Sequence, residues 1–177
     1  MKAIAATIAI LALVSGSALA QSPYAGMQTR SIKALSAQQI DDLKAGRGMG
    51  LALAAELNGY PGPLHVLELS DRLALSADQK QRIQKLFDSM KAEATPIGAR
   101  LIEQEGALDR QFANRSITSD ALQDATMKIG LTQAELRNAH LKYHLATAQI
   151  LSPEQMKQYA DLRGYSSDSP ARHHRMH

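Results

Sequence analysis

The chain has no cysteine and no tryptophan, and only 2 of its 177 residues are phenylalanine. Without cysteine it can form neither disulfide bonds nor thiolate ligands, so a metal site would have to use His, Met, Asp or Glu side chains. The 20 basic and 17 acidic residues nearly balance and form no basic block, which excludes the charge footprint of a nucleic-acid-binding surface. No Ser-His-Asp set stands out, and the glycine-rich segment 46–50 lacks the Lys-Ser/Thr of a phosphate loop. We therefore expect no enzyme.

The first twenty residues have the pattern of an export signal. Lys2 provides the positive charge, residues 3–14 form an apolar run, and Ala18-Leu19-Ala20 is a small-x-small cleavage site. The run is shorter than the roughly 20 apolar residues of a permanent membrane span. We expect cleavage after Ala20 and a periplasmic protein that is not an integral membrane protein.

The remaining sequence predicts an all-α fold. Three Leu-Ser-x-x-Gln segments begin at Leu35, Leu75 and Leu151, and each predicts a capping box at a helix start. Either Thr118 or Ser119 can cap the helix between the last two. The predicted helices cover about 36–45, 51–57, 64–73, 76–112, 119–150 and 153–163. We divide the chain into the signal peptide 1–20, an N-terminal linker with short helices over 21–63, a helical domain over 64–165 and a disordered His-rich tail over 166–177.

The two longest predicted helices carry facing apolar seams. In the first, apolar residues follow steps of four and three up to Leu101, where Gln104 interrupts the pattern before Leu108. In the second, they recur every seven residues. The positions are Ile83, Phe87, Met90, Ala94, Ile97, Leu101 and Leu108 in the first helix, and Leu122, Ile129, Leu136, Tyr143 and Ile150 in the second. We expect an antiparallel hairpin, kinked at Pro96. A seam of this length needs cover from other helices, and a second copy of the chain is a natural source, so we expect a homodimer.

His140 and His144 lie one helical turn apart on the same face of the second long helix. If the hairpin turns near Arg115, Met90 and Lys91 lie opposite His140, and Phe87 lies opposite His144. His65 precedes the same end of the hairpin.

Two interpretations of these histidines stay open. His65, His140 and His144, with Met90 as a soft ligand, can form a site for Zn²⁺, Ni²⁺, Co²⁺ or Cu²⁺ that the fold itself does not require. Alternatively, His140 and His144 are ordinary residues at the edge of the seam. The tail holds a second, weaker metal-capable group or is simply solvated; its candidate ligands are His173, His174, Met176 and His177.

Residues 75–79 and 151–155, which flank a long helical pair behind an export signal, resemble the LTxxQ-motif family of periplasmic proteins, with Ser where the family more often has Thr. The family includes the Spy and CpxP chaperones, the zinc-resistance-associated protein and CnrX-like heavy-metal sensors. The resemblance covers roughly residues 64–165. It implies a hooked helical hairpin that dimerises into a curved cradle, and a role in envelope stress or metal response.

The resemblance also concerns single residues. His65, His140 and His144 match ligand positions of the heavy-metal sensors, whereas Leu69 and Phe87 stand where two further ligands are expected. We therefore expect a periplasmic heavy-metal-binding or sensing protein with a membrane-bound signalling partner. The alternative is an ATP-independent chaperone that binds unfolded periplasmic proteins.

Overall fold

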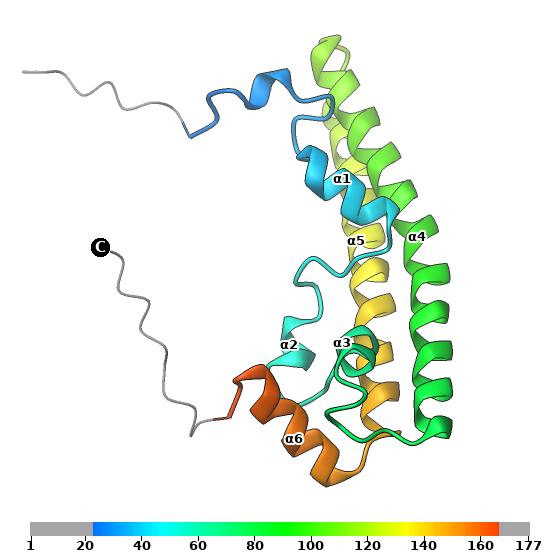
Figure 1. Cartoon of the computed structure of the whole chain (residues 1–177). Helices are drawn as coiled ribbons and strands as arrows, with labels where there is room; N and C mark the ends of the chain where they lie inside the picture. The colour runs from blue at the N-terminus through cyan, green and yellow to red at the C-terminus, as the bar shows by residue number, and fades with distance from the viewer. Residues whose placement is uncertain (1–22, 167–177) are drawn as a thin grey trace, which may run out of the picture.

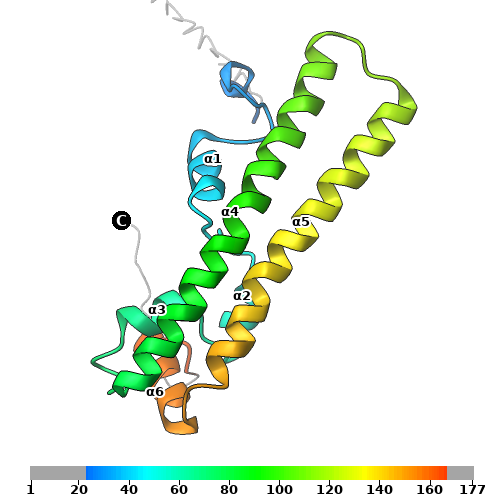
Figure 2. The same cartoon turned by 90° about the vertical axis from the view of Figure 1, so that its right-hand side faces the viewer.

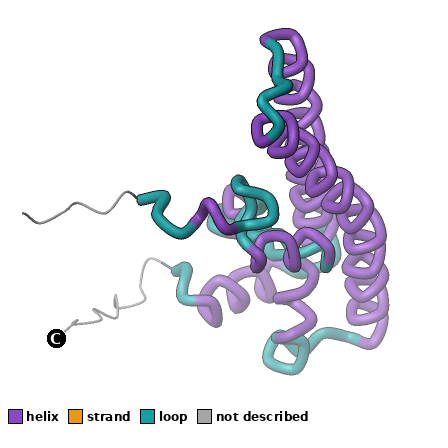
Figure 3. Tube along the Cα trace, turned by 90° about the horizontal axis from the view of Figure 1, so that it is seen from above, coloured by secondary structure: helices purple, strands orange, loops and turns teal. Residues whose placement is uncertain are grey.

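The computed structural model describes residues 23–166. The predicted signal peptide and all but the first residue of the predicted tail lie outside the described residues, so both remain predictions. The described helices are α1 (Ala37–Lys44), α2 (Leu53–Glu56), α3 (Pro63–Glu68), α4 (Ala77–Ala113), α5 (Ser119–Ala148) and α6 (Pro153–Arg163), with a 3-10 turn at Met27–Thr29. No strand is present in this part of the chain (Figure 3), so the predicted all-α class is confirmed.

Serine and threonine side chains start the main helices, as predicted. The side chains of Ser36, Ser76 and Ser152 each accept a hydrogen bond from the backbone N–H of the glutamine three residues on. The side-chain oxygen of that glutamine in turn accepts a hydrogen bond from the serine backbone N–H. Thr118, rather than Ser119, caps α5. Such caps satisfy backbone N–H groups that have no partner inside the helix. Helix α3 differs from its prediction: it ends at Glu68 rather than at Leu73, and turns follow it.

The second and third capping boxes are joined to each other. The side-chain amides of Gln79 and Gln155 exchange two hydrogen bonds, of 2.8 and 3.0 Å. Gln79 also donates to the carbonyl of Ile150, and Gln155 donates to that of Leu73. The glutamines thus fasten the start of α6 to the start of α4, in addition to capping their own helices.

Helices α4 and α5 pack side by side along most of their length, and the shorter helices lie on the concave side of this bowed pair (Figures 1 and 2). Helix α4 continues through Pro96. Lys142 pairs with Glu93 across the two helices, and Glu135 pairs with Arg100. These pairs place the register about one helical turn away from the one predicted from a turn near Arg115, because the connection between the helices lies further along the chain.

Two apolar clusters form the core, one at each end of the concave side. The first cluster joins α1 to the long pair, and its buried members are Leu35, Leu43, Ala94, Leu101, Ile129 and Leu136. The second cluster joins α3 and α6 to the start of α4, and its buried members are Val66, Leu73, Leu75, Ile83, Leu151 and Tyr159. None of the helices in the described part of the chain is both long and apolar enough to cross a membrane.

Helix α1 approaches α4 most closely at Gly98. A Cβ atom added to Gly98 would clash with the backbone carbonyl of Leu43, which cannot move as a flexible side chain can. A glycine inside a long helix costs roughly 0.5–1 kcal/mol relative to alanine. The close packing of α1 on α4 is the physical reason for glycine at this position.

We predict that Gly98→Ala lowers the free energy of unfolding by about 1–3 kcal/mol, because overpacking forces α1 away from α4. Gly130→Ala is the matched control, since nothing lies within 4 Å of its added Cβ, and it should stabilise the protein by roughly 0.5–1 kcal/mol. Urea denaturation followed by circular dichroism measures both. Equal effects of the two substitutions would contradict the close packing.

Candidate functional site

A hollow of about 490 Å³ lies on the concave side, where the segment 45–53 and the start of α3 face α4 and α5. His65, Met90, His140 and His144 all line it. The structure thus brings the four described candidate residues to one place. The weaker candidates His173, His174, Met176 and His177 lie outside the described residues.

The backbone holds His144 in one orientation. Its Nδ1–H donates to the carbonyl oxygen of Tyr60 over 2.7 Å, and in a neutral imidazole with this tautomer Nε2 is the acceptor or ligand atom. Gly62 lies against the ring edge, where an added Cβ would come within 2.8 Å of the ring carbon Cε1. Orientation of an imidazole by a backbone carbonyl is common among metal-binding histidines.

His140 lacks such support at one atom. The residue is 2% exposed, and its buried Nε2 has no hydrogen-bond partner. The backbone of Gly48 covers the ring, with an added Cβ only 3.4 Å from Nδ1. Burial lowers the pKa of His140, and the neighbouring His144 lowers it further. His140 is therefore a neutral imidazole whose unpaired nitrogen would gain from a partner, since unmet buried polar groups are unfavourable.

Met90 and His65 occupy different parts of the same hollow. Met90 is buried and contributes a soft thioether. His65 is half-buried, and its Nδ1 lies 3.1 Å from the Glu68 carboxylate. Phe87 also lines the hollow and offers no ligand atom.

The sequence interpretation missed the carboxylate beside His144. Glu56 is 6% exposed and its Oε2 lies 3.7 Å from His144 Nδ1. It accepts hydrogen bonds from the Gly62 backbone N–H and the Tyr159 hydroxyl, and Arg163 lies 3.6 Å away. The one sequence feature that could have indicated a buried role for Glu56 is its place in the short apolar stretch 51–57. A carboxylate engaged in this way supports the fold around the histidines.

Within residues 23–166, no three His, Asp or Glu side chains form a group that could hold a metal ion. The site therefore offers two imidazoles and a nearby thioether, with remaining positions open to water or an added ligand. Imidazole suits Zn, Ni and Cu, and a thioether favours the softer ions.

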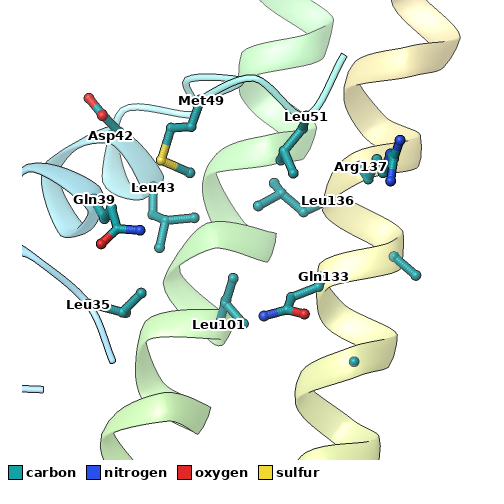
Figure 4. A pocket seen from close by; sticks show the side chains of 12 residues that line it. Leu35, Gln39, Asp42, Leu43, Met49, Leu51, Leu101, Gln133, Leu136 and Arg137 are labelled. Atoms are coloured by element: carbon teal, nitrogen blue, oxygen red, sulfur yellow. The ribbon is translucent and has the colours of Figure 1, made fainter. Parts of the chain in front are cut away.

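A second hollow of about 670 Å³ lies between α1, α4 and α5 (Figure 4). Leu43, Leu101 and Leu136 form its apolar base. Arg137 stands at its edge, and no described residue forms an ion pair with it. Met49 lines both hollows, whereas the rest of the segment 46–50 lines only the hollow with the histidines.

No protein-family model, curated protein or solved structure matches this chain. The family resemblance therefore rests on the sequence segments described above.

We predict that acid destabilises the protein partly through His140. Because its pKa in the folded state lies below the unfolded value of 6.5, the unfolded chain binds the proton more readily. This contribution is complete above pH 6.5 and is lost as pH falls below it, at no more than about 1.4 kcal/mol per pH unit. In His140→Leu, the free energy of unfolding should therefore fall less between about pH 7 and 5 than in the native protein. Urea denaturation in the presence of a chelator measures this free energy. The difference between the two proteins at pH 8, where His140 is neutral in both the folded and unfolded states, measures the effect of the substitution on packing alone. If the free energy of unfolding falls equally steeply below pH 6.5 in both proteins, the prediction is refuted.

Proposed function

We propose that this protein binds a divalent transition metal in the periplasm and acts in metal sensing or sequestration. The observation that carries the proposal is the unpartnered, buried Nε2 of His140 beside an imidazole, His144, whose Nδ1 is already engaged. A bound ion would give the His140 nitrogen the partner it lacks. His140 and His144 would be the main ligands, with Met90 and His65 as further candidates from the same hollow.

The metal is not needed for folding in this proposal. His140 and His144 are held by helix α5 and by contacts with Tyr60, Gly62 and Gly48. Since a site of two histidines is incomplete, binding would be reversible and would leave positions for a further ligand. Zn²⁺, Ni²⁺, Co²⁺ and Cu²⁺ all suit imidazole. A sensing role also requires a membrane-bound partner that responds to the metal.

We predict that His140→Ala/His144→Ala weakens Zn²⁺ or Ni²⁺ binding at least about a hundredfold, since the loss of supporting contacts alone costs about 10–100-fold at metal sites. Calorimetric titration of the chain from Gln21, with residues 173–177 removed from both forms, measures the loss without the tail histidines. Circular dichroism verifies that both forms are folded. Equal affinities would end the proposal.

A second candidate function, an ATP-independent chaperone, is favoured by the hollow between α1, α4 and α5. Its leucine base and accessible Met49 can receive apolar side chains of an unfolded client, because methionine adapts to varied partners. The uncompensated Arg137 can attract an acidic client segment. In this role the helix pair would act as the hooked hairpin that the family resemblance implies, with two copies forming the cradle.

We predict that the protein suppresses aggregation of a reduced client at near-equal ratio without ATP, and that Met49→Glu/Ala134→Glu loses most of this effect. Both residues line the hollow and are exposed, so a carboxylate there should repel apolar segments without entering the core. Phe112→Glu is the matched control, because Phe112 is 53% exposed and lies outside the hollow. Light scattering measures aggregation. No suppression by the native protein would refute this function.

A further inference from the structure

The hollow that holds His140 and His144 is larger than a metal ion requires. Two imidazoles leave up to four coordination positions on a six-coordinate ion, and four waters would occupy about 120 Å³ at roughly 30 Å³ each. The hollow measures about 490 Å³, which falls within the roughly 300–1,000 Å³ typical of sites for small organic molecules. The site therefore has room for a ligand besides the ion.

The hollow also has an exposed apolar wall. Leu53, Leu64 and Tyr165 line it and are 54%, 41% and 37% exposed. Apolar side chains with a few polar groups among them are typical of sites that enclose an organic molecule. An ion bound by imidazoles alone does not use this surface, whereas an organic ligand can pack against it.

The charges of the hollow favour an acidic ligand. Glu56 is the one carboxylate among the described residues that line it, and both its oxygens already accept hydrogen bonds. Arg163 lies beside Glu56, and Arg47 pairs with Asp42 over 2.6 Å, so both arginines have carboxylate partners. The wall therefore offers a bound ion no free carboxylate.

Lys91 is the one lysine or arginine of this wall that has no carboxylate partner among the described residues. Its ammonium lies 5.8 Å from the centre of the Phe87 ring, which lines the same hollow. The pairing of Glu93 with Lys142 across the two long helices places residue 91 level with His144. A divalent ion at the imidazoles adds positive charge near this ammonium, whereas a carboxylate is attracted by both.

We propose that the hollow takes the metal together with a small organic acid that chelates it, with His140 and His144 on the ion and Lys91 beside a carboxylate of the acid. This inference rests on the proposed metal binding and identifies the class of ligand that completes the site. Imidazole and carboxylate occur together as ligands of Zn²⁺. A di- or tricarboxylate can coordinate the ion through two oxygens and keep a further carboxylate for the lysine.

Equilibrium dialysis of the chain from Gln21, with citrate as the organic acid, tests this inference. The free Zn²⁺ concentration is held constant while citrate is raised, so citrate cannot lower the occupancy by removing the ion. A site for the bare ion keeps its occupancy under these conditions. We expect instead that citrate raises the apparent Zn²⁺ affinity at least about fivefold and that one citrate is retained per ion. By linkage, Zn²⁺ should raise the citrate affinity by the same factor.

Lys91→Gln should reduce the gain from citrate about two- to fivefold, the range of an exposed ion pair, without weakening the binding of Zn²⁺ alone. Lys85→Gln is the matched control and should leave the gain unchanged, because Lys85 is an exposed lysine of the same helix that does not line the hollow. His140→Ala/His144→Ala removes binding at the hollow and measures what the tail histidines contribute. Circular dichroism verifies that each variant is folded.

If Zn²⁺ binds but citrate brings no gain, this inference is wrong and the proposed metal binding stands. If neither Zn²⁺ nor its citrate complex binds the native chain more tightly than the double histidine variant, the proposed metal binding is wrong and this inference falls with it. Citrate binding whose affinity the metal does not change also overturns the inference. Equal gains in Lys91→Gln and Lys85→Gln overturn the placement of the acid beside Lys91.

Discussion

The buried carboxylate of Glu56 is the constraint on which the end of the molecule around the histidines depends. It accepts from the Gly62 backbone and the Tyr159 hydroxyl, and it lies beside Arg163 and His144. These partners come from the turn before α3, from α5 and from α6. An unpaired buried charge is strongly unfavourable, and removing one partner of a buried pair typically costs about 3–5 kcal/mol. The contacts of Glu56 therefore stabilise the relative positions of the turn before α3, helix α5 and helix α6.

The hydrogen bonds of Glu56 also fix the backbone segment that orients His144. Tyr60, whose carbonyl orients His144, lies between Glu56 and Gly62, and both ends of that short segment are tied to the carboxylate. His144 is thus fixed before any ligand arrives. His140, one turn earlier on α5, packs under Gly48 and keeps an unmet nitrogen. The site combines one oriented imidazole with one buried nitrogen that lacks a hydrogen-bond partner.

The sequence predicted what local chemistry decides. Each capping box, and Thr118 at the start of α5, satisfies backbone groups a few residues away, so these helix starts could be placed correctly. It could not predict the bond between Gln79 and Gln155, or the role of Glu56, because those partners are brought together only by packing. That His65 and Met90 lie at the same end of the helix pair as His140 and His144 was expected from their positions in the chain. The contacts of Gly48 with His140 and of Gly62 with His144 could not be predicted. A close approach of backbone to a ring produces no periodic pattern in the sequence.

The concave side has two hollows with different chemistry. Met49 lines both and has a backbone φ of 44°, a left-handed conformation that is uncommon for residues other than glycine. A ligand that displaced Met49 from one hollow would therefore change the wall of the other.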